Sequence, residues 1–363
     1  MHGASRWGFR CVTRPPSEMA NFFNSVNITN FKSLKSVTLS DCKRINLLIG
    51  KPNVGKSNIL EALGLFGLGY VRFNRNKKLT QYVRFENVPE LFFQGNIHEP
   101  ICIAINDDES NCRLDYFDSN PQTLQEVIEH YDKALNINLF LNGHHNHLFI
   151  NNDLNVIETP QFTGFAPVKA YKFTANLVLE KQNLPYLVPP FGVNLLNVIQ
   201  ADKGLKGDLA RIFSEYGLKL VFDMANHSLK LMKETSGDEI FLLPYSSIAD
   251  TLQRIIFFKA AIASNQDSIL LFEEPEAHCF PPYITHIAKE IIGSESNQFF
   301  IATHSPYILD AFLENARTDL AIFMADFKDG QTVIKRLTDA ELNDVYEYGL
   351  DLFFNAELFT DEI

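Results

Sequence analysis

The sequence lacks any apolar run close to the roughly 20 residues that a helix needs to cross a bilayer. Its five cysteines are scattered, and no two of them form a C-x-x-C pair. An odd, unpatterned set of this kind predicts reduced thiols in a cytoplasmic protein. Residues 1–18 contain three arginines but no apolar stretch like that of a secretory signal. We expect them to form a disordered extension outside the fold.

Positive charge is also scarce. The chain has 32 Lys and Arg against 44 Asp and Glu, a net charge of −12, so its surface as a whole does not attract nucleic acid. The densest basic stretch is interleaved with aromatic residues and comprises Arg72, Arg75, Lys77, Lys78 and Arg84. Such a stretch could contact a nucleic-acid backbone and its bases. The alternative that its charge pattern favours is a solvated loop.

One segment of the chain has the pattern of a phosphate-binding loop. Residues 50–57 read G-K-P-N-V-G-K-S, after an apolar run at 45–49 that predicts a buried strand and before a predicted helix at 57–63. Glycines allow a tight backbone turn whose N–H groups point at phosphates, and the helix N-terminus adds partial positive charge. Lys56 is expected to neutralise the β- and γ-phosphates and Ser57 to ligate Mg²⁺. The residues expected at the nucleotide are Gly50, Asn53, Val54, Gly55, Lys56, Ser57 and Asn58. The sequence therefore predicts that ATP and Mg²⁺ bind here.

A second chemistry-bearing segment follows a predicted buried strand at 268–272. That strand ends in Glu273-Glu274-Pro-Glu-Ala-His278, which places carboxylates at the carboxyl edge of a sheet, where ligands bind. Glu273 is expected to support Mg²⁺, and Glu274 to orient or deprotonate the attacking water. An acidic helix cap after a core strand is the alternative.

A third segment, Ala302-Thr-His304-Ser-Pro306, ends another predicted strand, so His304 should reach the same edge. An imidazole there could bond the γ-phosphate or the attacking water. A lone histidine at a strand end is more often structural, but the order of the three segments favours a role in catalysis.

The rest of the chain is read from its periodicity. Strands are expected at 26–29, 37–40, 101–105, 113–117, 139–141 and 148–150, and helices at 123–134, 193–199 and 205–216. Antiparallel strands are expected at 218–224, 228–232 and 239–243. Alternating helices and strands follow at 248–263, 268–272, from Pro281, 298–302, 307–313 and 320–325, and a hairpin turn at 328–330. Heptad repeats are absent, which argues against a long coiled-coil arm.

In combination, these segments resemble the ATPase heads of the ABC/SMC-like AAA clade, particularly compact bacterial ATPases related to the OLD family. The matching residues are 50–57, 272–278, 302–306 and the early run 28–34. The resemblance implies an α/β fold, an ABC-type P-loop ATPase head with a mixed sheet flanked by helices and an inserted α+β arm. It divides the chain into a split head at 19–75 and 240–345, an insertion at 76–239 and a tail at 346–363.

The resemblance also implies a homodimer, or a higher oligomer, that encloses ATP between one subunit's phosphate loop and the other's signature motif. Two departures from the family pattern concern this site. Glu273 replaces the usual aspartate. Its side chain is one methylene longer, so its carboxylate must approach Mg²⁺ with a different geometry. The signature stretch 245–254 aligns Ser247 as the serine that reaches the neighbour's γ-phosphate, but Ala249 and Thr251 stand where glycines are common. Ser247 is expected to cap a helix that starts at Ile248, and a helix cap alone is the alternative.

Other features are weaker. His144, His145 and His147 resemble a metal cluster, but a hairpin turn is the simpler interpretation of this stretch. We expect any nuclease or toxin to be a separate effector protein, because the stretch after His304 is short for a nuclease module. By analogy, the predicted function is an ATPase that controls an effector in genome maintenance or antiphage defence. The alternatives are a nucleotide-gated scaffold with little turnover and a DNA-repair ATPase of the SMC/RecF type.

Overall fold

The computed structural model describes residues 22–117, 133–159, 164–175, 177–234 and 239–360. The expected extension at 1–18 and most of the expected helix at 123–134 lie outside the described residues. The last two residues of that helix, Lys133 and Ala134, instead begin strand β6 (Lys133–Leu141). The helix prediction is wrong there, because Lys133 pairs with Asn151 of the next strand and the Ala134 carbonyl accepts from the Phe117 N–H.

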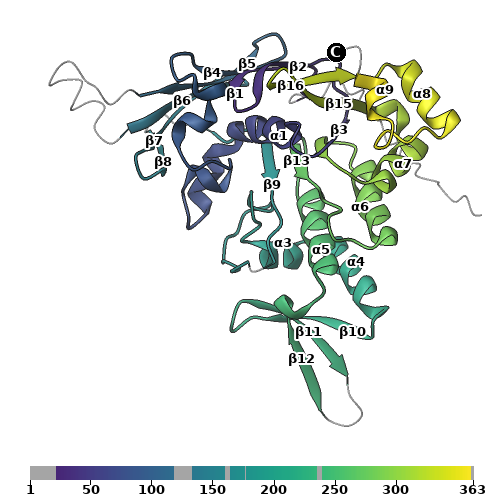
Figure 1. Ribbon diagram of the computed structural model, residues 1–363. Helices are drawn as coiled ribbons and strands as arrows, with labels where there is room; N and C mark the ends of the chain where they lie inside the picture. The colour runs from purple at the N-terminus through teal and green to yellow at the C-terminus, as the bar shows by residue number, and fades with distance from the viewer. Residues whose placement is uncertain (1–21, 118–132, 160–163, 176, 235–238, 361–363) are drawn as a thin grey trace, which may run out of the picture.

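A six-stranded, mostly parallel sheet forms the centre of the molecule (Figure 1). Its order is β16 (Gln331–Arg336), β15 (Leu320–Lys328), β3 (Ile45–Gly50), β14 (Gln298–Ala302), β13 (Ile269–Glu273) and β9 (Val168–Tyr171). All six residues of β3 are buried, which explains its continuous apolar run, since a parallel strand is covered on both faces. β3 lies between β14 and β15, so residues from the two ends of the chain form one sheet.

A second, antiparallel sheet has seven strands. Its order is β2 (Leu34–Leu39), β1 (Val26–Phe31), β4 (Ile101–Ile105), β5 (Ser110–Tyr116), β6, β7 (His144–Asn151) and β8 (Val156–Glu158). Strand β4 alternates between buried and half-buried residues, as expected of a sheet with one face packed on a core. Helix α1 (Lys56–Gly64) lies between this sheet and the central one, and one apolar core cluster spans all three (Figure 1).

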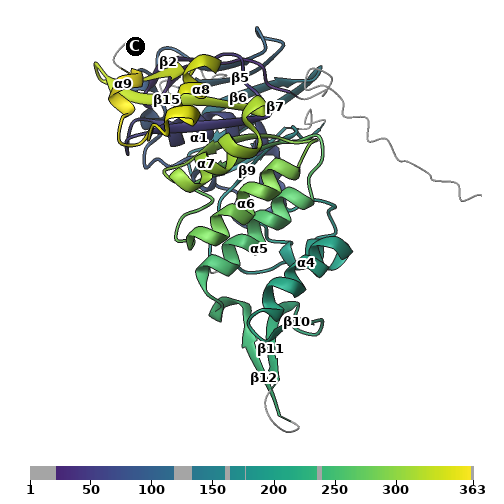
Figure 2. The same cartoon turned by 90° about the vertical axis from the view of Figure 1, so that its right-hand side faces the viewer.

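Helices cover the opposite face of the central sheet. They are α3 (Leu195–Ala201), α4 (Lys203–Ser214), α5 (Asp250–Ala263), α6 (Pro281–Gly293) and α7 (Pro306–Asn315), and they share a second core cluster with the sheet. Figure 2 shows α5 and α6 side by side, in agreement with their contacts. At the far end, β10 (Leu218–Asp223), β11 (Ser228–Glu234) and β12 (Ile240–Pro244) form the predicted antiparallel sheet, which extends away from the head (Figure 2).

The residues expected as one insertion, 76–239, are distributed over three places. Strands β4 to β8 extend the sheet of β1 and β2, and β9 joins the central sheet. Strands β10 and β11 belong to the projecting sheet, whose third strand, β12, begins just after the expected insertion, at Ile240. The proposed domain boundaries stay a prediction. The predicted α/β class with a mixed sheet flanked by helices is confirmed.

The C-terminal part of the chain returns to the phosphate loop. After α8 (Asp339–Tyr348), helix α9 (Ala356–Thr360) packs on β15 and β16. Glu357 of α9 forms an ion pair of 2.8 Å with Lys51, inside the loop. Among the described residues, no helix combines the length and the apolar character needed to span a bilayer.

Candidate nucleotide-binding and hydrolysis site

The phosphate loop joins β3 to α1 and is shaped by two glycines. A Cβ on Gly50 would lie 2.2 Å from the carbonyl oxygen of Ala325, so only glycine allows β15 to approach this closely. Gly55 has a φ of 103°, in the left-handed region that favours glycine. Asn53 also has a positive φ, 63°, which asparagine tolerates better than most residues. Asn53 and Gly55 line the cavity described below, whereas the Val54 side chain is buried.

Lys56 is the first residue of α1 and is only 5% exposed. Its Nζ donates to the carbonyl oxygens of Gly50, at 2.8 Å, and Lys51, at 2.7 Å. Burial lowers the pKa of Lys56 to about 8, against the opposing effect of the nearby Glu274 and Glu273 carboxylates. The ammonium group therefore lies inside the loop, close to where phosphates are expected, and no carboxylate of the described residues forms an ion pair with it.

The two acids lie at the carboxyl end of β13. Glu273 is the last residue of the strand, and Glu274 follows with a φ of 42°, which is uncommon for a glutamate and is found mainly where structure constrains the backbone. The Glu274 N–H donates to the Ala302 carbonyl at 2.9 Å, which ties it to the end of β14. Two residues after Ala302, the His304 Nε2 lies 3.6 Å from Oε1 of Glu274. Two of the three segments expected to carry the chemistry thus meet at one sheet edge.

Burial and the charge on Lys56 lower the pKa of His304, and the Glu274 carboxylate opposes them. His304 therefore favours its neutral form near pH 7.

Glu276 links the acidic turn to the turn that carries His304, a role that was not expected from the sequence. Its Oε1 accepts hydrogen bonds from the Thr303 hydroxyl, at 2.5 Å, and from the His304 N–H, at 3.2 Å. Thr303 in turn accepts from the Ser305 N–H at 3.0 Å. Burial raises the pKa of Glu276 above its ordinary value. The only sign of this role in the sequence is a third acid within a short acidic run.

A single cavity of about 840 Å³ collects these groups. The predicted residues that line it are Asn53, Gly55, Lys56, Ser57, Asn58, Glu273, Glu274 and His304. It is also lined by residues that were not expected there from the sequence, including Gln81, Arg84, Lys172, Phe173 and Arg254. Gly50 and Ser247 are not among its lining residues.

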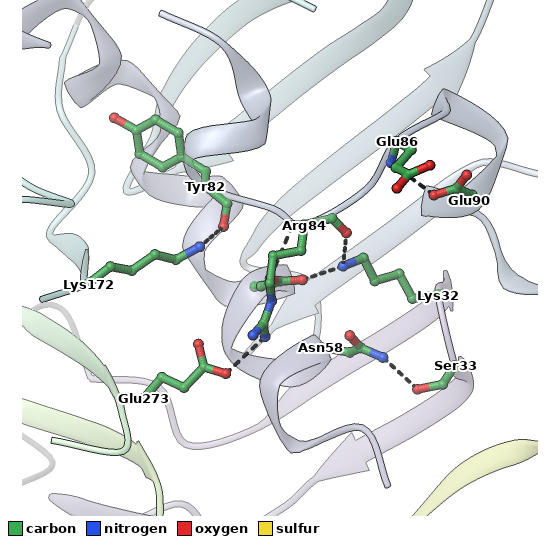
Figure 3. A network of polar contacts seen from close by, with 10 residues as sticks. Lys32, Ser33, Asn58, Tyr82, Arg84, Glu86, Glu90, Lys172 and Glu273 are labelled. Atoms are coloured by element: carbon green, nitrogen blue, oxygen red, sulfur yellow. Dashed lines mark hydrogen bonds and ion pairs between the residues drawn. The ribbon is translucent and has the colours of Figure 1, made fainter. Parts of the chain in front are cut away.

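Arg84 reaches this cavity from the loop after the 3₁₀ turn Leu79–Gln81 (Figure 3). Its Nη2 donates to Oε1 of Glu273 at 2.9 Å, and its Nε donates to Oε1 of Glu61 at 2.8 Å. The same loop is held from two sides, because Lys172 donates to the Tyr82 carbonyl at 2.7 Å and Lys32 donates to the Arg84 carbonyl at 2.6 Å. Arg84 therefore lines the same cavity as the phosphate loop and contacts one of the two acids there.

Arg72 and Arg75, which form one basic stretch with Arg84 in the sequence, also form ion pairs. Arg72 pairs with Glu158, and Arg75 pairs with Glu180 at 2.8 Å. Carboxylates from distant segments thus partly neutralise this stretch, which a charge pattern along the sequence cannot reveal.

Ser247 lies outside the cavity, at the end of the 3₁₀ turn Tyr245–Ser247. The expected cap is wrong. The chain is extended at Ile248, helix α5 begins at Asp250, and no side chain caps its Ala249 position. The Ser247 side chain is two residues too early to accept from the first free N–H groups of the helix.

The three histidines lie on strand β7 and not in the hairpin turn. His145 packs against Phe140, with ring centroids 4.4 Å apart and ring planes tilted by 32°, and His147 contacts Asn136. No cluster of three or more potential His, Cys, Asp or Glu ligands occurs within the described part of the chain.

The oxygen donors at the cavity suit Mg²⁺. The Ser57 hydroxyl and the Glu273 carboxylate both line it. Mg²⁺ at nucleotide sites usually takes one or two such protein groups, and phosphate and water oxygens complete the shell.

A phosphate loop with two acids and a histidine at the same sheet edge defines a P-loop nucleoside triphosphatase. Residues 45–310, well over half of the chain, match the family model described as "AAA domain, putative AbiEii toxin, Type IV TA system". The chain belongs to this family and is an AAA-type ATPase. The predicted membership of the ABC/SMC-like AAA ATPases is thus confirmed. A special closeness to the OLD family stays a prediction.

Curated relatives match in two different ways. An ATP/GTP phosphatase of Helicobacter pylori is 21% identical over 325 residues, which are 79% of this chain and 86% of the relative. The DNA replication and repair protein RecF of Caldanaerobacter subterraneus is 35% identical over 65 residues, which are 18% of this chain and 17% of RecF. The match to RecF is thus confined to a short segment.

Among solved structures, an SMC head bound to the C-winged helix domain of ScpA aligns with a TM-score of 0.48 at 14% identity, covering 89% of this chain and 99% of that one. The SMC head domain from Thermotoga maritima aligns with a TM-score of 0.41 at 10% identity, covering 87% and 99%. Both TM-scores are below 0.5.

Proposed function

We propose that this chain hydrolyses ATP to ADP and phosphate as one head of a homodimer, and that its nucleotide state controls a separate effector protein. The observation that carries this proposal is the single cavity that brings together Lys56, Ser57, Glu273, Glu274 and His304. Positioned charge is what phosphoryl transfer needs from a protein, because the reaction depends mainly on alignment and electrostatic stabilisation.

Each group has a role that follows from its place. Lys56 and the loop N–H groups hold the phosphates. Ser57 and Glu273 would hold Mg²⁺, which would offset the negative charge of the phosphates. Glu274 accepts a proton from the attacking water, because it is an exposed carboxylate beside the phosphate loop. His304, at 3.6 Å from Glu274, bonds the water or the γ-phosphate.

The dimer is proposed because Ser247 is exposed and lies outside its own chain's cavity, so it is free to reach a neighbour's nucleotide. The family description mentions a putative toxin and a type IV TA system. The mention of a toxin supports a toxin as the effector. By analogy, we extend the proposal to a nuclease effector and to a role in antiphage defence or genome maintenance.

A second candidate is a nucleotide-gated scaffold that holds an effector with little turnover. It is favoured by the altered signature stretch, in which Ser247 caps no helix. A DNA-repair ATPase of the SMC/RecF type is less favoured, because Arg72, Arg75 and Arg84 are already paired with carboxylates.

Mixing two inactive variants tests the shared site. Lys56→Ala removes the cation that holds the phosphates, and Ser247→Arg blocks the surface expected to face the neighbour. Each homodimer should be inactive, because each of its sites carries one lesion. A mixed dimer should regain activity in one intact site. If exchanged subunits recover no ATPase activity, catalysis is completed within one chain and the scaffold becomes the better proposal.

A further inference from the structure

The Arg84 side chain joins two carboxylates on different elements. Its Nε lies 2.8 Å from Oε1 of Glu61 on α1. Its Nη2 lies 2.9 Å from Oε1 of Glu273 at the end of β13 (Figure 3). Arg84 and Glu273 are 189 residues apart in sequence. The guanidinium group thus connects the helix of the phosphate loop to the acid expected at the metal.

The Glu61 end of this bridge is fixed. The Glu61 side chain is only 3% exposed and also accepts from the Arg84 backbone N–H at 3.2 Å. Lys32 holds the same unit from the other side, with its Nζ 2.5 Å from Oε2 of Glu61 and 2.6 Å from the Arg84 carbonyl oxygen. The Arg84 backbone is therefore anchored through both its N–H and its carbonyl, and Nη2 is presented to Glu273 from a fixed base.

The Glu273 end has less support of its own. Its side chain is 27% exposed, and its ion-pair partner among the residues that the structure describes is Arg84. A glutamate has one more side-chain torsion than an aspartate, so fixing its carboxylate loses more rotamer entropy. Arg84 occupies Oε1 and leaves Oε2 available. Ser57, the other expected metal ligand, lies one turn before Glu61 on the same face of α1.

We propose that Arg84 is a positioning residue that holds the long Glu273 side chain so that its second oxygen faces the magnesium site. This inference rests on the proposed nucleotide function. Outer-shell partners of metal ligands typically contribute 10–100-fold to metal affinity. Because Arg84 is 58% exposed, we expect an effect near the lower end of that range.

The test measures the affinity for a non-hydrolysable ATP analogue by calorimetry, with and without Mg²⁺. For Arg84→Ala, the affinity for the analogue without Mg²⁺ should change less than about twofold. The Mg²⁺ concentration at which the Mg²⁺-dependent gain in analogue affinity is half-maximal should rise about tenfold. Arg84→Lys keeps the charge but cannot bond both carboxylates, so it should lie between Arg84→Ala and the wild type. Arg75→Ala is the matched control, since Arg75 is also an exposed arginine paired with a glutamate at 2.8 Å, and it should match the wild type.

A double-mutant cycle tests whether the effect of Arg84 depends on the longer side chain of Glu273. Aspartate has one torsion fewer and a shorter reach, so in a Glu273→Asp background the further change Arg84→Ala should shift the Mg²⁺ requirement less than about twofold. Equal shifts in both backgrounds would contradict positioning of Glu273.

The other outcomes each overturn the inference. A lower Mg²⁺ requirement in Arg84→Ala would make Arg84 a counter-ion that the metal displaces. Equal losses with and without Mg²⁺, together with a lower melting temperature, would make it a structural clamp on Glu61. A wild-type chain whose nucleotide binding does not depend on Mg²⁺ would instead refute the proposed magnesium site itself.

Discussion

Gly55 is packed where no side chain fits, which makes Gly55→Ala a quantitative test of the phosphate loop. A Cβ at this position would lie 2.1 Å from the Thr332 hydroxyl oxygen and 2.8 Å from the Ser33 hydroxyl oxygen. These two hydroxyls are themselves hydrogen-bonded at 2.6 Å, so they cannot separate without losing that bond. The residue also has a φ of 103°.

Two effects add in Gly55→Ala. Left-handed backbone destabilises a non-glycine residue by about 1–2 kcal/mol. Overpacking a tight site destabilises by a further ~1–3 kcal/mol. The sum is about 2–5 kcal/mol, and at about 2 °C for each kcal/mol in a chain of this size, the unfolding temperature should fall by about 4–10 °C. Scanning calorimetry measures this shift, and nucleotide binding should be lost in the same variant.

The chain offers a matched control for the backbone effect. Gly95 has a φ of 73°, and a Cβ added to it would have no atom within 4 Å, so Gly95→Ala should destabilise by about 1–2 kcal/mol only. Adding Thr332→Ala to Gly55→Ala removes the nearest clash and should recover part of the lost stability. If Gly55→Ala is no less stable than Gly95→Ala, the loop relaxes freely and the packing argument fails.

Three further predictions concern the acids and His304. Glu274→Gln should bind ATP but not hydrolyse it, leaving a stable ATP-bound dimer in gel filtration, because an amide cannot accept the proton from water; rapid turnover would exclude Glu274 as the base. The same change removes the charge that raises the pKa of His304, so an NMR titration should give a lower pKa for its ring than in the wild type. Burial raises the pKa of Glu276, so the folded state binds more protons, and its contribution to stability is lost as pH rises from the unfolded value towards the folded one. Glu276→Gln keeps an acceptor for Thr303 but does not titrate. The unfolding free energy of this variant relative to the wild type should therefore increase in urea titrations as the pH rises above the ordinary glutamate pKa of about 4; a constant difference would contradict the raised pKa.

The sequence alone determined the parts of the site that depend on neighbouring residues. The turn from Gly50 to Ser57 follows from its own glycines, and the places of Glu273 and His304 follow from the apolar strands before them. Because carboxyl ends of parallel strands share one edge of a sheet, order along the chain was enough to bring these groups together.

Tertiary structure alone decided the charge environment of these groups. In sequence, Arg84 belongs to a basic stretch, and in the fold it bonds Glu61 and Glu273 from two other elements. Ion pairs and close contacts form between residues far apart in the chain, and local patterns of charge and periodicity contain no information about which distant segments meet.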